Sequence, residues 1–90
     1  MVKGKESLID ALTVGATIED KDIYDLEKEL KVVDNEDIKA VFDRLIAGSE
    51  NHMRAFDKLL YQESGKHYKV QFITEKRLQE ILEGGSNRGK

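Results

Sequence analysis

The sequence has 90 residues, of which 39% are hydrophobic and 37% are charged, and its formal net charge is −3 at pH 7. This length allows one small domain, and the apolar content is too high for a disordered chain. The absence of cysteine excludes disulfides, thiolate metal sites and cysteine nucleophiles. The acidic net charge argues against nucleic acid as a partner, and no apolar run approaches the roughly 20 residues of a transmembrane helix. No secretory signal is recognisable at the N-terminus, so we expect a cytoplasmic protein.

The first predicted helix covers about residues 7–31. Ser7 and Asp10 have the spacing of a capping box, in which the two side chains satisfy N–H groups at the start of a helix. Apolar residues then recur with the helical period as far as Leu30. Gly15 interrupts them and costs roughly 1 kcal/mol relative to alanine. We therefore expect this glycine to allow another helix to pack closely.

The second predicted helix covers about residues 35–63. Asp34 precedes it as the expected N-cap, and Val33 and Ile38 have the spacing of a hydrophobic staple. Gly65 is the expected end of the helix. The short turn between the two helices predicts an antiparallel helical hairpin.

The last third of the chain is predicted to hold one short helix, over residues 75–83. Tyr68, Val70 and Phe72 alternate with polar residues, which indicates a short extended stretch before it. Thr74 is the expected N-cap, and residues 86–90 are predicted to be a disordered tail. We expect a single all-α domain over residues 1–85, with Leu78, Ile81 and Leu82 as the buried side of the short helix.

Each long helix carries a stripe of side chains that is apolar at its ends and polar at its centre. Glu19 and Asp22 form the first polar centre, and Ser49 and His52 form the second. Measured from the turn, His52 lies about four residues beyond the level of Glu19, or roughly 6 Å along the axis. Long side chains can close that gap, so we expect the two centres to lie near one level. The stripes are Leu8, Leu12, Gly15, Glu19, Asp22 and Leu26, then Ile38, Phe42, Leu45, Ser49, His52, Phe56 and Leu59.

The polar centres have two interpretations. A carboxylate between helices needs a partner, and a Glu–His ion pair or hydrogen bond is the simpler one. Carboxylates and imidazoles that project inward from facing helices also build metal sites in bundles. Two other polar residues are set aside: His67 is predicted to be a remote surface residue, and Glu50 to face nearly opposite to His52. No glycine-rich phosphate loop is present, so we expect no organic cofactor.

The run from Gly48 to Phe56, together with the segments from Ser7 to Leu12 and from Val14 to Ile23, resembles the ferritin-like family catalogued as domain of unknown function 2202. The resemblance covers about Ser7 to Phe56 and corresponds to the second, C-terminal hairpin of that family. It implies a four-helix bundle of two hairpins, whose inward glutamates and Glu-x-x-His pairs hold a di-iron or related centre.

The resemblance assigns metal-ligand roles to three residues. Glu19 and His52 would be ligands, and Asp22 would be a further ligand or would orient an imidazole. Ser49 stands where a full Glu-x-x-His pair would have its glutamate, and the first hairpin is absent. One chain therefore supplies half of such a site.

We expect the missing half to come from a homodimer, or from a second hairpin on another chain. The leading hypothesis is a ferritin-like protein that binds iron, manganese or zinc across the dimer and supports oxidoreductase chemistry. The alternative is a non-enzymatic dimerisation or binding module, in which the polar centre is a buried hydrogen-bond network.

Overall fold

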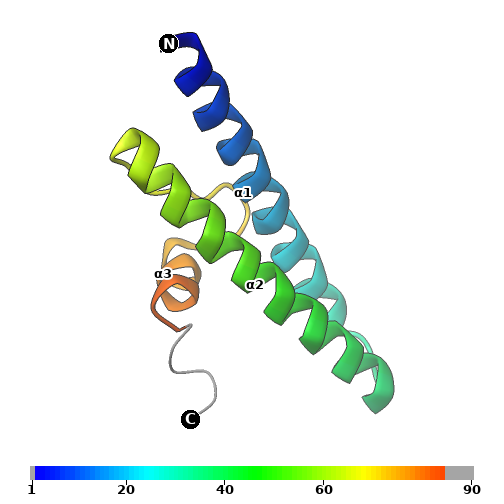
Figure 1. The fold of residues 1–90 in the computed structure, drawn as a ribbon. Coiled ribbons are helices and arrows are strands. Elements are labelled where there is room, and N and C mark those ends of the chain that lie inside the picture. The colour runs from blue at the N-terminus through cyan, green and yellow to red at the C-terminus, as the bar shows by residue number, and fades with distance from the viewer. Residues whose placement is uncertain (1, 85–90) are drawn as a thin grey trace.

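The computed structural model describes the backbone of residues 2–84 and the side chains of residues 6–84. The described residues form three helices: α1 (Val2–Leu30), α2 (Glu36–Ser64) and α3 (Glu75–Gly84) (Figure 1). The described part of the chain contains no strand, which confirms the all-α prediction. None of these helices has the long apolar run needed to cross a membrane, within the residues described. The predicted tail, residues 86–90, lies outside them.

The helix ends differ from the predicted ones at two places. α1 begins at Val2, so Ser7 and Asp10 lie inside the helix instead of capping it. The lysines and glutamate before Ser7 are good helix formers, and the helix continues through Gly4. α2 is capped by Asn35, not Asp34, because the Asn35 side chain accepts the Ile38 N–H at 3.1 Å.

The other two predicted boundaries are confirmed. Gly65 ends α2 in the left-handed conformation, with φ at 77°, and its N–H donates to the carbonyl of Tyr61. The hydroxyl of Thr74 accepts the N–H of Arg77 at 3.0 Å and caps α3.

The buried side of α2 differs in part from the predicted stripe, of which Ser49 is buried and Phe56 packs against the core. Leu45, His52 and Leu59 were expected in the buried stripe, but all three are exposed. The buried side chains come one residue later, at positions 46, 53 and 60. Ile46 is buried outside the main cluster, whereas Met53 and Leu60 belong to the core, which comprises Leu12, Ala16, Ile23, Met53, Leu60, Tyr68, Ile73, Leu78 and Ile81.

Gly15 of α1 packs directly against the ring of Phe56 on α2. A Cβ added there would lie 2.5 Å from Cε1 of Phe56 and 2.6 Å from its Cζ. Since real Cβ atoms do not approach so closely, the ring of Phe56 occupies the space that any larger residue would need. The expectation that Gly15 serves helix packing is confirmed.

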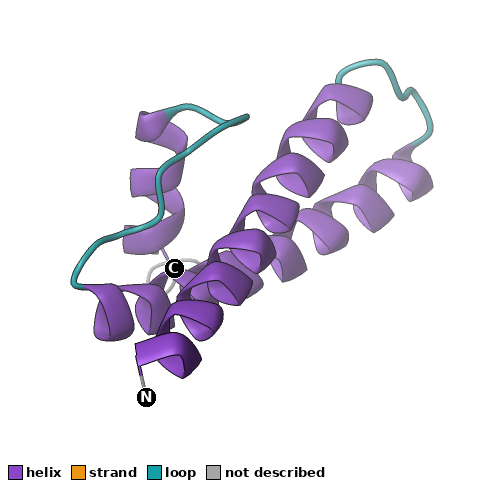
Figure 2. Ribbon diagram, turned by 90° about the horizontal axis from the view of Figure 1, so that it is seen from above, coloured by secondary structure: helices purple, strands orange, loops and turns teal. Residues whose placement is uncertain are grey.

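α3 and the loop of residues 65–74 cover one face of the hairpin (Figure 2). Asp20 on α1 and Asp57 on α2 point to this covered face, because both contact the loop. Residues two positions away lie about 160° round each helix and so on the other side. We call that side the uncovered face; its exposed apolar residues are Leu8, Ile18, Ile38, Val41, Leu45 and Leu59.

Candidate functional site

Two of the three predicted ligands, Glu19 and His52, are in contact near the middle of the hairpin. Nδ1 of His52 is 3.3 Å from Oε2 of Glu19, so α1 and α2 place these two side chains in contact. The Glu19 side chain is 13% exposed and that of His52 is 67% exposed. Asp22 lies one turn further along α1 and is also exposed. His52 and Asp22 therefore face solvent on the uncovered face. Glu19 lies next to His52, where α1 packs against α2.

A single chain does not assemble a closed metal site from these residues. Within the described residues, no group of three or more histidine, aspartate and glutamate side chains is placed to hold a metal ion. The metal-ligand roles of Glu19, Asp22 and His52 stay predictions. Their donor types suit a transition metal, and Glu19 already fixes one edge of the His52 ring.

Asp20 is a buried carboxylate that the sequence did not reveal as special. It has no exposed surface, and it accepts the Tyr68 hydroxyl at 2.6 Å. It also accepts the backbone N–H groups of Gln71 at 2.8 Å, Phe72 at 3.1 Å and Ile73 at 2.8 Å. Burial and the hydrogen bond to Asp20 raise the pKa of Tyr68 to about 12. Asp20 thus holds the loop before α3 against α1.

Asp57 performs a similar task from α2. It is 4% exposed; its Oδ1 accepts the Tyr68 N–H at 2.7 Å and its Oδ2 lies 2.8 Å from Nδ1 of His67. The His67 ring stacks on Tyr61, with centroids 4.4 Å apart and planes inclined by 15°. His67 is exposed as predicted, but it is not an isolated surface residue, because a buried carboxylate and an aromatic ring hold it.

Glu50 is the third buried carboxylate, at 2% exposure. The prediction that it faces away from His52 is confirmed, yet that direction is the covered face and not solvent. Nη2 of Arg77 lies 2.5 Å from Oε2 of Glu50, and Nε of Arg77 donates to Glu27 at 2.9 Å. Burial lowers the pKa of Arg77, but the hydrogen bonds that it donates to Glu27 and Glu50 outweigh this and raise the pKa.

One signal in the sequence could have indicated the covered face of α2. Glu50 and Asp57 are seven residues apart, and Met53 lies between them, so the three share one side of the helix. Acids at this spacing beside an apolar residue are consistent with a paired, buried side. Asp20 offers no comparable signal, because most of its partners are backbone N–H groups 51 to 53 residues away.

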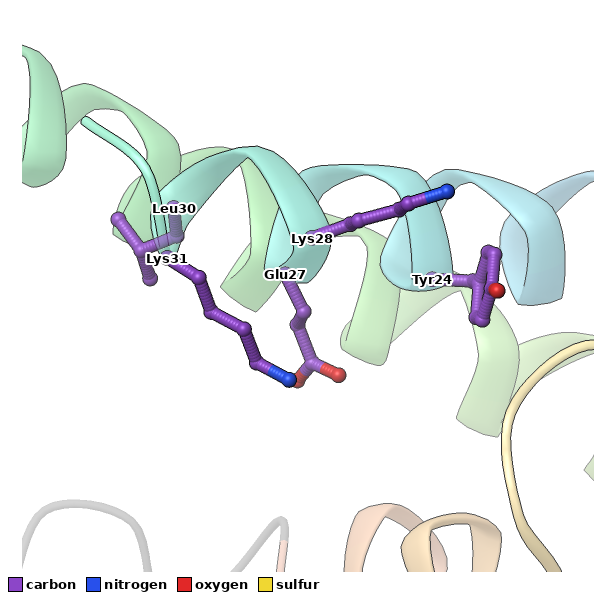
Figure 3. A pocket seen from close by; sticks show the side chains of 5 residues that line it. All are labelled: Tyr24, Glu27, Lys28, Leu30 and Lys31. Carbon is purple, nitrogen blue, oxygen red and sulfur yellow. The ribbon is translucent and has the colours of Figure 1, made fainter.

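A shallow groove runs along the outer side of α1, with a volume of about 560 Å³. Figure 3 shows Glu27 and Lys31 pointing toward one another and Lys28 extending toward Tyr24. Nζ of Lys28 is 5.7 Å from the centroid of the Tyr24 ring. The charges of this groove are mixed and its lysines are exposed. It therefore differs from the covered face, where the carboxylates are buried.

These elements define an all-α protein built on a helical hairpin with a third helix on one face. A family model for an uncharacterised protein domain, DUF2202, matches residues 1–85, and the chain belongs to that family. The match extends beyond the segment from Ser7 to Phe56 that carries the resemblance in the sequence.

The chain is similar to a protein of Methanocaldococcus jannaschii described as uncharacterised protein MJ0754. The two are 51% identical over 87 residues, which cover 97% of this chain and 46% of that protein. A crystal structure of hypothetical protein MJ0754 from Methanococcus jannaschii superposes with a TM-score of 0.78 at 53% identity, over 82% of this chain and 42% of that one. The chain therefore spans about half the length of this relative.

Proposed function

We propose that the chain is a helical assembly module, whose uncovered face docks on a second copy of the hairpin to give a ferritin-like four-helix bundle. The observation that carries the proposal is a regular row of exposed apolar side chains. On α2 the row comprises Ile38, Val41, Leu45 and Leu59, which are 45% to 50% exposed. Their spacing of three, four and fourteen residues fits the repeat of a helix-packing stripe.

α1 adds to the same face. Leu8 is 44% exposed and Ile18 is 54% exposed. Several exposed apolar residues on one face mark an interaction site more often than scattered single residues do. A second hairpin laid across both rows would enclose them in the core of a four-helix bundle, with α3 remaining on the outside.

A second copy of this chain is the occupant that we favour. A twofold dimer brings one surface against itself, and the uncovered face is apolar at both ends with polar residues between. Apolar ends can therefore meet apolar ends, and His52 and Asp22 can meet their own copies. The relative of about twice this length also has enough chain to supply a second hairpin, as a bundle of this kind requires.

Metal binding at the centre of that interface is the second candidate function. It is favoured by the exposure of His52 and Asp22 on the uncovered face, and by the contact of Glu19 with Nδ1 of His52. Nε2 would then be the metal-binding nitrogen and Glu19 would orient the ring. Two copies would supply two imidazoles and two Asp22 carboxylates as ligands, which suit iron, manganese or zinc. A bound pair of redox-active ions would supply oxidation or peroxide chemistry.

The assembly proposal is tested by the mass of the protein in solution. Light scattering behind size exclusion is expected to give a dimer, and Leu45→Glu is expected to give a monomer with unchanged helical circular dichroism. Val32→Glu is the matched control, because Val32 is 73% exposed in the turn and off the uncovered face. A wild-type monomer of full helicity at every concentration would contradict assembly from two copies.

Metal content tests the second candidate separately. Stoichiometric metal that is lost in both Glu19→Ala and His52→Ala, and retained in His67→Ala, would support a site at the interface. His67 is the suitable control because it is the other histidine and lies on the covered side. A dimer without metal, in wild type and variants alike, would reject the metal site and leave the assembly function standing.

A further inference from the structure

A second groove lies on the covered side of the hairpin, between α2 and the end of α3. Its volume is about 450 Å³. Arg54, Lys58 and Tyr61 line it from α2, and His67 and Leu82 line it from the loop and α3. The first three follow the four- and three-residue steps of one helix side. This groove shares no residue with the uncovered face, so it is independent of the assembly function.

His67 is held in this groove in one orientation although its side chain is 60% exposed. Asp57 fixes Nδ1, and the ring of Tyr61 fixes the face of the imidazole. Since Nδ1 and Nε2 lie on opposite sides of the ring, Nε2 points away from Asp57. An exposed histidine normally samples several rotamers, so this arrangement presents one ring nitrogen in a defined direction.

The polar groups that line the groove are predominantly cations and hydrogen-bond donors. Arg54 and Lys58 are basic side chains, and both oxygens of Asp57 are already engaged by His67 and the Tyr68 N–H. Arg54 donates to the carbonyl of Ile81 and to Oδ1 of Asn51, which leaves the other N–H groups of its five-donor guanidinium for a ligand.

We propose that this groove binds a phosphate monoester that carries an aromatic or apolar group. Lys58 and Arg54 would neutralise the phosphate. Nε2 of His67 would accept from a phosphate hydroxyl or, when protonated, donate to a phosphate oxygen. The apolar part of the ligand would pack on the Tyr61 ring and Leu82, which supply apolar walls. Binding needs no covalent step and no metal.

Phenyl phosphate is the probe for the test. Titration of the folded chain, followed by ¹H–¹⁵N spectra of the His67 ring, is expected to give a saturable shift with Kd of roughly 1 mM. Lys58→Gln and His67→Gln are each expected to weaken binding by about fivefold or more. Lys66→Gln is the matched control, because Lys66 neighbours His67 in sequence but lines a different groove. Inorganic phosphate and phenol, which each keep one half of the probe, are expected to bind more weakly than phenyl phosphate.

Three results would overturn the proposal. One is the absence of a saturable shift with phenyl phosphate. Another is equal affinity in wild type and Lys58→Gln, a substitution at an exposed residue that leaves the fold intact. The third is an equal loss in Lys66→Gln, which would assign the effect to diffuse positive charge instead of this groove.

Discussion

The two faces of the hairpin place their acidic residues in opposite situations. On the covered face, Asp20, Glu50 and Asp57 are 0%, 2% and 4% exposed, and each contacts the stretch between His67 and Arg77. On the uncovered face, Asp22 is exposed and Glu19 lies beside the exposed His52.

The covered acids contribute to folding, whereas the polar residues of the uncovered face are available for association. A buried carboxylate is tolerated when hydrogen bonds or a cation compensate it, so the three covered acids tie the loop and α3 to the hairpin. Exposed polar groups in an apolar row carry little folding energy and can serve a partner. Substitutions on the covered face should change the free energy of unfolding, and those on the uncovered face should change association.

Asp20→Ala is the largest expected effect. It removes the acceptor of the Tyr68 hydroxyl and of three backbone N–H groups in residues 71–73. Buried donors without acceptors cost the full desolvation penalty. We therefore expect the free energy of unfolding, measured in urea, to fall by about 3–5 kcal/mol. Asp22→Ala, two residues away on the exposed side, is the control and should stay within about 0.5 kcal/mol. Similar losses in both variants would remove the distinction between the faces.

Arg77→Ala comes next in size. It removes the cation between Glu27 and the buried Glu50, and we expect a loss of about 2–3 kcal/mol, because Arg77 itself is partly exposed. Adding Glu50→Gln should recover part of that loss, since a neutral amide does not leave a charge in the core. Lys76→Ala, at the adjacent exposed position, should have little effect on urea unfolding. A further loss on adding Glu50→Gln would contradict the electrostatic explanation.

The sequence predicts much of the fold because the signals for it are local. The helical period, the Thr74 cap and the Gly65 end depend on residues within a few positions of each other. Gly15 was correctly linked to close helix packing, and the estimate of helix levels brought Glu19 near His52. Each of these inferences used spacing along one or two helices, and spacing is what a sequence states directly.

The buried register of α2 could not be read in the same way. α2 carries two neighbouring apolar rows, one through Leu45 and Leu59 and another through Ile46, Met53 and Leu60. Period alone does not tell which of them packs on α1.

The covered acids were missed for a related reason. The partners of Asp20 and Glu50 lie 27 to 53 residues away, and many are backbone groups that have no signature in the sequence. An acid in a helix is therefore predicted to be solvated until the fold supplies its partner.

Tyr68→Phe is expected to cost about 1–2 kcal/mol, through loss of the hydrogen bond to the Asp20 carboxylate. It also changes the pH dependence. The pKa of Tyr68 is raised from 10.0 to about 12 by burial and by Asp20, so the folded protein keeps a proton that the unfolded chain loses. This contribution is complete below pH 10 and is lost as pH rises to about 12.

Urea unfolding at several alkaline pH values checks this linkage. Wild-type stability should fall more steeply between about pH 10 and 12 than that of Tyr68→Phe. Tyr24→Phe is the control, since Tyr24 is 41% exposed, and it should follow the wild-type slope. If stability fell equally steeply with pH in wild type and Tyr68→Phe, ionisation of Tyr68 would not be the cause of the loss of stability at alkaline pH.

The smallest effect is expected where Gly15 of α1 packs against Phe56 of α2. Gly15→Ala gains up to about 1 kcal/mol in helix propensity but forces the Phe56 ring to move, at about 1–3 kcal/mol. We expect a net loss of about 1 kcal/mol in thermal or urea unfolding. Gly48→Ala is the matched control: a Cβ there meets no atom within 4 Å, so the same substitution should stabilise α2.

The Phe56→Leu background tests the cause of that loss. A smaller side chain at position 56 frees the space at Gly15, so Gly15→Ala should change sign and become stabilising there. Measuring both glycine variants in the Leu45→Glu background keeps association from contributing. If Gly15→Ala and Gly48→Ala stabilised the protein equally, the contact between Gly15 and Phe56 would have no energetic consequence. Position 15 would then accept alanine as readily as an exposed position does.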